Sequence, residues 1–155
     1  MKTKKISYSQ MKKLNTIKYF KSLNPFPWNI TDLIASYEYA QTPEMIKYFK
    51  SKNPSVGDVS WLLVHCKYTQ TPEMLEYFKS LKPSANDVST LIIECKHYQT
   101  AEMIKYYKSL KPSIENIRVL TDNCTYAQTP EMLEYLIRRM LQLYRKLKRK
   151  SLEQQ

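Results

Sequence analysis

The sequence repeats with a period of 29 residues, and this period limits the possible folds more than any other feature. Three residue types return at this step: Gln41, Gln70, Gln99 and Gln128; Tyr19, Tyr48, Tyr77, Tyr106 and Tyr135; Pro25, Pro54, Pro83 and Pro112. Four full repeats run from about residue 12 to 127, and a half repeat continues into the C-terminal segment. Such periods are typical of solenoid proteins, in which each repeat packs against its neighbours.

Each repeat predicts two helices, the first of which begins at Thr-Pro-Glu. In the second repeat Thr42 would supply the N-cap oxygen, and Pro43 suits the first helical position, where no N–H is needed. Apolar residues between 45 and 49 then follow at helical spacing and predict one packed face. The next proline ends the helix because it excludes the residue before it from the helical region.

The second helix opens with a variant of the capping box, seen in Ser55–Asp58 and again in Ser84–Asp87. Its apolar residues fall at i, i+3, i+4 and i+7, which places them in one stripe. The stripe residues are Ile30, Leu33, Ile34 and Tyr37; Val59, Leu62, Leu63 and Cys66; and Val88, Leu91, Ile92 and Cys95. A lone pair of helices cannot bury this stripe, whereas stacked pairs can.

We therefore expect an all-α fold: an α-solenoid of stacked helical hairpins, with four full repeats, a half repeat and a C-terminal capping helix. A single glycine argues against sheets, whose turns depend on positive φ. The expected single domain, 1–155, comprises a basic arm (1–11), the repeats (12–137) and a basic C-terminal helix and tail (138–155). The capping helix should turn Leu136, Met140, Leu143 and Leu147 inward.

The net charge of +11 is concentrated at the two ends of the chain. Residues 1–13 and 138–155 hold 12 of the 25 basic residues and one of the 14 acidic residues, which leaves 13 of each in between. Neither a secretory signal nor a membrane-spanning apolar run is recognisable. The chain is therefore expected to be intracellular, in the cytoplasm or nucleus.

One face of the second helix differs from repeat to repeat, although the stripe on its other side stays apolar in nearly every copy. The differing residues in successive repeats are Trp28, Asp32 and Ser36; Gly57, Trp61 and His65; Asn86, Thr90 and Glu94; and Glu115, Val119 and Asn123. A scaffold that repeats its core and varies one exposed face is suited to recognition. Both tryptophans fall on this face, where their exposure would need a reason. We expect it to bind a protein partner; neutral drift on a solvated surface is the alternative.

A second set of residues suggests RNA or another nucleic acid as the partner. Lysines recur on the first helix at the 29-residue step, and basic residues crowd the C-terminal helix. The candidates are Lys21, Lys50, Lys79 and Lys108, together with Arg138, Arg139, Arg145, Lys148 and Arg149. Such a row can track phosphates, but it is more often a solvated face. A membrane is the least expected partner; attachment to an acidic membrane surface would use the C-terminal helix.

No pattern typical of catalysis, metal binding or cofactor binding emerges. Cys66, Cys95 and Cys124 share the 29-residue step, so they are equivalent core positions about 10 Å apart in stacked repeats, too far for a disulfide. His65 and His97 occupy non-equivalent positions, and one glycine cannot build a phosphate-binding loop. We expect a non-enzymatic protein that needs no cofactor, no metal and no small-molecule substrate.

The segment Glu102–Leu110 resembles the second helix of ankyrin repeats, and the upstream Leu91-Ile92-x-x-Cys95 is similar to the spacing of their first helix. This resemblance covers about residues 12–137. It implies that the variable face lies on the inner helices, the surface with which ankyrin repeats bind proteins.

A weaker resemblance to pentatricopeptide repeats is carried by Cys95-Lys96 with residues 102–107 and by the spacing of residues 83–91. It implies binding of single-stranded RNA. The two resemblances therefore lead to the same two partner classes as the residues do, a protein first and a nucleic acid second.

Overall fold

A computed structural model describes residues 8–153 of the chain, so most of the expected basic arm lies outside the described residues. Within that range the fold is all-helical, with nine α-helices, four short 3-10 helices and no strand. The chain divides into two compact units, residues 1–81 and 82–155.

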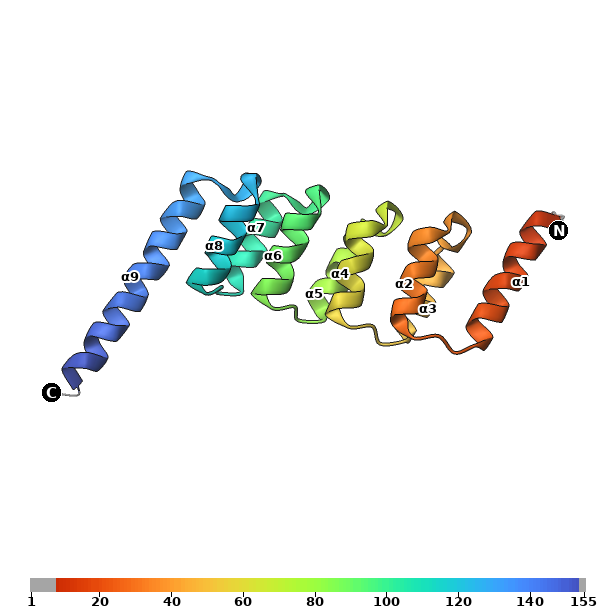
Figure 1. The fold of residues 1–155 in the computed structure, drawn as a ribbon, viewed down its shortest axis with the longest axis horizontal. Helices are drawn as coiled ribbons and strands as arrows, with labels where there is room; N and C mark the ends of the chain where they lie inside the picture. The colour runs from red at the N-terminus through yellow and green to blue at the C-terminus, as the bar shows by residue number, and fades with distance from the viewer. Residues whose placement is uncertain (1–7, 154–155) are drawn as a thin grey trace. The chain divides into compact units, whose positions relative to one another are not determined.

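The N-terminal unit contains two pairs of helices after an initial single helix (Figure 1). Its elements are α1 (Tyr8–Ser22), α2 (Pro27–Ser36), η1 (Glu38–Ala40), α3 (Pro43–Ser51), α4 (Val56–His65), η2 (Lys67–Thr69) and α5 (Pro72–Ser80). The second helices α2 and α4 pack side by side, and each also contacts the first helix that follows it.

The C-terminal unit contains two such pairs of helices without a preceding single helix, and its last helix is the longest of the described helices (Figure 1). Its elements are α6 (Ala85–Glu94), η3 (Lys96–Tyr98), α7 (Ala101–Ser109), α8 (Ile114–Asn123), η4 (Thr125–Ala127) and α9 (Pro130–Glu153). Here α6 packs against α8, α7 follows α6, and α9 packs against α8.

The predicted helix starts are confirmed by their hydrogen bonds. The hydroxyl of Thr42 accepts a hydrogen bond from the backbone N–H of Met45 at 3.2 Å, and the equivalent threonines of the later repeats do the same. At α4, Asp58 accepts from the backbone N–H of Ser55 at 2.8 Å, while Ser55 accepts from that of Asp58 at 3.1 Å. Such caps satisfy N–H groups that a helix leaves unpaired at its start.

Each first helix is followed by a residue in a left-handed backbone conformation, which the sequence analysis did not predict. The residue before each repeat proline adopts the left-handed conformation, with φ between 51° and 55°; these residues are Asn24, Asn53, Lys82 and Lys111. This conformation lies outside the right-handed helical region, as the proline requires. Asparagine tolerates it well, whereas for lysine it carries a steric cost.

The repeated glutamines cap the ends of the second helices. The side-chain amide of Gln99 donates a hydrogen bond to the backbone carbonyl of Ile92 at 3.1 Å. Gln41, Gln70 and Gln128 make the same bond, each to the residue seven positions earlier. The 3-10 turn between helix and glutamine folds the chain back, so that the amide reaches a carbonyl that has lost its helical partner.

The predicted stripe forms the core, with exceptions at its ends. Val59, Leu62 and Leu63 are completely buried, and Cys66 is also buried, although it caps α4 instead of lying within it. In the first repeat, however, Leu33 is only half-buried and Tyr37 is 50% exposed. Within the described residues of the N-terminal unit, α2 is the first of the second helices, so no earlier one covers this side.

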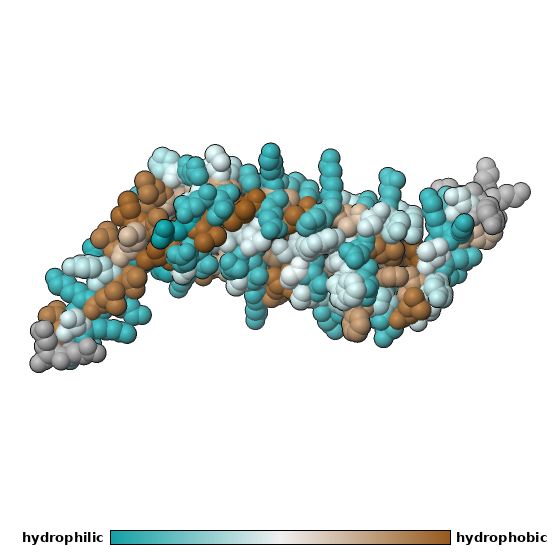
Figure 2. Space-filling model, viewed as in Figure 1, coloured by the Kyte–Doolittle hydropathy of each residue, from teal (hydrophilic) through white to brown (hydrophobic). Residues whose placement is uncertain are grey.

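The predicted packing of the C-terminal helix is wrong for most of its length. Leu136 is half-buried, but Met140, Leu143 and Leu147 are 52%, 46% and 57% exposed. Figure 2 shows hydrophobic residues of α9 at the molecular surface. The error arises because α8 packs against one side of α9 and leaves these side chains exposed, whereas an amphipathic pattern looks the same whether or not its apolar face is covered.

Replacing Gln99 by Glu should lower the stability of the protein by about 1 kcal/mol, because a carboxylate cannot donate the capping hydrogen bond to Ile92. Chemical denaturation would measure this loss. Gln142→Glu is the matched control, since Gln142 is exposed and accepts a hydrogen bond from Arg139, which Glu can also do. Equal stability of the Gln99→Glu variant and the wild type would contradict the capping role.

Tyr107→Phe should raise the stability by about 1 kcal/mol, because the buried Tyr107 hydroxyl has no hydrogen-bond partner among the described residues. The equivalent residues of earlier repeats are Phe49 and Phe78, which shows that the site accepts phenylalanine. Denaturation of this variant would be compared with that of Tyr126→Phe, whose ring is exposed.

Burial also raises the pKa of Tyr107 well above the usual 10.0. Above pH 10.0 the tyrosine ionises in the unfolded chain but stays neutral in the folded protein. Ionisation therefore favours unfolding, and stability should fall as the pH rises above 10.0. Tyr107→Phe should weaken this alkaline loss. An unchanged pH profile together with unchanged stability would contradict the account of this site.

Candidate interaction surface

In the N-terminal unit the variable face is exposed opposite the buried stripe. Trp28, Asp32 and Ser36 lie exposed on α2, and Trp61 and His65 lie exposed on α4, which packs beside it. Trp28 is 57% exposed and Trp61 is 39% exposed. Large aromatic side chains at this level of exposure are enriched at protein interfaces, because they bring much contact area with few rotatable bonds.

The ring of Trp61 is held in place by its neighbour on the next turn. The rings of Trp61 and His65 stack with centroids 4.4 Å apart and an interplanar angle of 19°. The Nδ1 of His65 lies 2.9 Å from the carbonyl oxygen of Trp61, and it must donate because a carbonyl only accepts. The pair therefore presents a preorganised aromatic surface.

Gly57, the single glycine of the chain, lies on this face one helical turn before Trp61. Its φ is not positive, and an added Cβ would meet only the Ser55 hydroxyl, at an ordinary contact distance of 3.6 Å. The fold therefore does not require glycine at this position. Glycine also makes the helix less stable than alanine would. Its effect is to leave open space next to Trp61.

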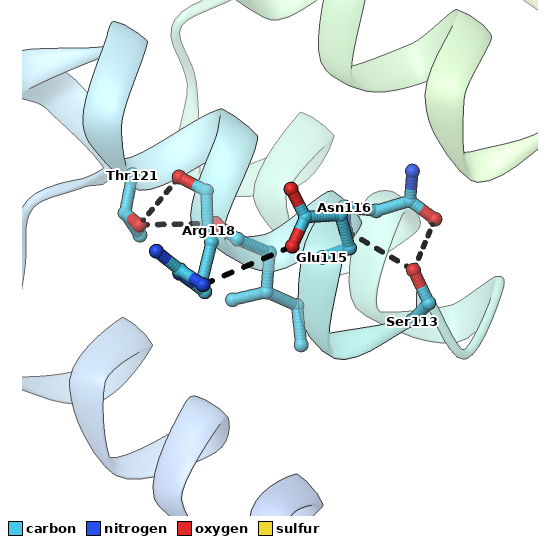
Figure 3. A network of polar contacts seen from close by, with 6 residues as sticks. Ser113, Glu115, Asn116, Arg118 and Thr121 are labelled. Atoms are coloured by element: carbon cyan, nitrogen blue, oxygen red, sulfur yellow. Dashed lines mark hydrogen bonds and ion pairs between the residues drawn. The ribbon is translucent and has the colours of Figure 1, made fainter.

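In the C-terminal unit the same face is less aromatic and more engaged within its own helices. Glu94, Val119 and Asn123 are exposed, and Thr90 is half-buried. Figure 3 shows the start of α8, where the Ser113 hydroxyl caps the helix and Glu115 lies 3.9 Å from Arg118. The Asn123 amide donates to the Val119 carbonyl at 2.8 Å.

The repeated lysines contact tyrosine rings and do not form a row of free charges. The Nζ of Lys21 lies 4.8 Å from the centre of the Tyr48 ring, Lys50 lies at the same distance from Tyr77, and Lys108 lies 5.2 Å from Tyr135. Each pair joins two consecutive first helices of one unit. Such cation–π contacts explain why lysine and tyrosine recur with the same period.

The other nucleic-acid candidates differ in whether their side chains form ion pairs or hydrogen bonds within the protein. Lys79 forms an ion pair with Glu76 at 2.9 Å, and Arg138 forms one with Glu134. Arg139 donates to the backbone carbonyl of Pro112 at 3.2 Å. Arg145, Lys148 and Arg149 are exposed on α9 and have no ion pair or hydrogen bond with any described residue.

Sequence reasoning missed a groove that recurs between consecutive first helices within each unit. One groove, of about 660 Å³, lies between α1 and α3 and includes Ile17, Lys21, Tyr39 and Met45. The equivalent residues, 29 positions later, line a second groove between α3 and α5, and a third lies between α7 and α9. The only signal of these grooves in the sequence is that their lining residues recur every 29 positions. Packing of the helical core predicts the same recurrence, so the period alone does not indicate a groove.

The three cysteines are free and buried, in agreement with a packing role. Within residues 8–153, no group of three or more His, Cys, Asp and Glu side chains could hold a metal ion. Among the described helices, none combines the length and the apolar character needed to cross a membrane.

Comparison of the chain with protein-family models, with curated proteins and with solved structures finds no match.

Gly57→Ala should stabilise the protein by about 0.5–1 kcal/mol, because alanine favours the helix and its methyl group fits. Urea denaturation would measure the change, with Ser36→Ala, a second exposed position on the same face, as a comparison. A destabilised Gly57→Ala protein would mean that the fold itself needs the glycine.

Proposed function

We propose that the chain is a short α-solenoid of ankyrin-like helical repeats that acts as a non-enzymatic scaffold for protein–protein interaction. The partner would bind the exposed face of the second helices, centred on Trp28 and Trp61. The other residues of the proposed face are Asp32, Ser36, His65, Thr90, Glu94, Val119 and Asn123.

The exposure of the two tryptophans opposite a mostly buried stripe is the observation that carries this proposal. Packing fixes the position of α2 and α4, so the aromatic rings stand on a rigid support. A preorganised surface loses little conformational entropy on binding. The open space at Gly57 supports the same proposal, because it gives a partner access to the side of Trp61 at some expense in helix stability.

A nucleic-acid partner is the alternative, and the contacts of the repeated lysines count against it. Ammonium groups held over tyrosine rings have a structural role already, which explains their period without a phosphate track. Of the candidate nucleic-acid residues, those without a described contact, Arg145, Lys148 and Arg149, all lie on α9, which is short compared with a track along the repeats.

The test is capture of partners from a host lysate by the wild type and by Trp28→Ala/Trp61→Ala, with and without nuclease and at two salt concentrations. The double variant should lose at least about tenfold in captured protein, since truncation of an interface tryptophan typically costs 2 kcal/mol or more. Nuclease treatment should have no effect.

The matched control is Tyr68→Ala/Tyr126→Ala, which removes two exposed aromatic rings outside the proposed face. It should capture the partner as the wild type does. Unchanged capture by the tryptophan variant would rule out this face. Capture that nuclease abolishes, and that weakens steeply with salt, would favour the nucleic-acid alternative.

A further inference from the structure

Helix α9 carries a strip of apolar side chains that no described residue covers. The strip consists of Leu133, Ile137, Met140, Leu141, Tyr144 and Leu147, each between 48% and 63% exposed. At 100° per residue these six side chains fall within an arc of about 120°, and at 1.5 Å per residue they extend over about 21 Å. Figure 2 shows this hydrophobic surface along α9.

The part of α9 beyond the first turns is strongly basic. Seven Lys and Arg residues lie between 138 and 150, with no acidic residue among them. On the helical wheel they lie on both sides of the strip: Arg145 is about 40° beyond one edge and Lys150 about 60° beyond the other, while Lys148 falls within the arc of the strip. Long basic side chains at such edges can extend away from an apolar layer towards charged groups.

This arrangement is unfavourable for a helix that stays in water. Arg145 and Arg149 repel each other one turn apart, as do Lys146 and Lys150, and none of the four has an ion-pair partner among the described residues. The exposed strip adds the cost of hydrating apolar surface. A surface that is both apolar and negatively charged relieves both costs together.

We infer that α9 lies flat on an anionic lipid surface, with the strip turned towards the acyl chains and the basic edges contacting the lipid headgroups. An apolar face flanked by Lys and Arg is typical of interfacial helices, and each basic residue near an anionic leaflet adds to the attraction. This inference is independent of the partner face proposed on the second helices.

The geometry favours a flat surface over a protein that encloses the helix. Met132 is buried and Leu136 half-buried, and Arg139 and Lys146 line a groove with the start of α8, so one side of α9 is already occupied. A second copy of the chain is disfavoured by charge, because pairing of two strips would bring two sets of seven basic residues together.

The test is flotation of the full chain with vesicles of phosphatidylcholine alone or mixed with phosphatidylserine. The wild type should float with the mixed vesicles and stay in solution with phosphatidylcholine alone. Tyr144→Ser/Leu147→Ser, which removes two strip side chains without changing the charge, should lower the bound fraction by about tenfold or more. Arg145→Gln/Lys148→Gln should lower it by about tenfold.

Tyr68→Ser/Tyr126→Ser is the matched control, because it removes two exposed apolar side chains outside α9 and outside the proposed partner face, and it should bind as the wild type does. Circular dichroism would establish that all variants are folded. Three results would overturn the inference: vesicle binding that the serine variant retains; self-association that this variant abolishes, without vesicle binding; and binding to polyglutamate but not to vesicles.

Discussion

The structure depends on one constraint: a ten-residue second helix has an apolar stripe that its own hairpin cannot cover. Burying a Leu, Ile or Val side chain contributes roughly 1.5–3 kcal/mol, so leaving a stripe of three or four exposed would be too costly for a small domain. Packing of α2 on α4, and of α6 on α8, removes these side chains from water. The recurrence of an apolar stripe at equivalent positions of each repeat follows from this need.

The other repeated residues hold the packed helices in place, which separates structural positions from candidate functional ones. Glutamines cap the second helices, threonines cap the first, and lysines contact the tyrosine of the next first helix within each unit. Residues that recur at every step are therefore explained by the fold. Those that change, above all Trp28, Gly57 and Trp61, have no such explanation, and for this reason the proposed function is assigned to their face.

The sequence was sufficient to predict what depends on local interactions: the helices, their caps and the buried stripe. It was not sufficient for features that depend on tertiary context. The 3-10 turns and the glutamine caps involve atoms seven residues apart, brought together only when the chain folds back. The sequence analysis interpreted the lysine row as a phosphate track or a solvated face, and it did not predict that these lysines contact tyrosine rings. The inward orientation predicted for Met140, Leu143 and Leu147 was wrong, because periodicity shows that a face is apolar but not that anything covers it.

The most direct test of this account is the separation of α2 and α4, measured by magnetic-resonance distances between spin labels at Ser36→Cys and His65→Cys. These positions are exposed and equivalent, and the native Cys66 is buried, so labelling can be confined to the new thiols. Side-by-side packing predicts helix axes about 8–10 Å apart, and hence a short, narrow distance distribution. A broad distribution centred at more than about twice that spacing would contradict the account.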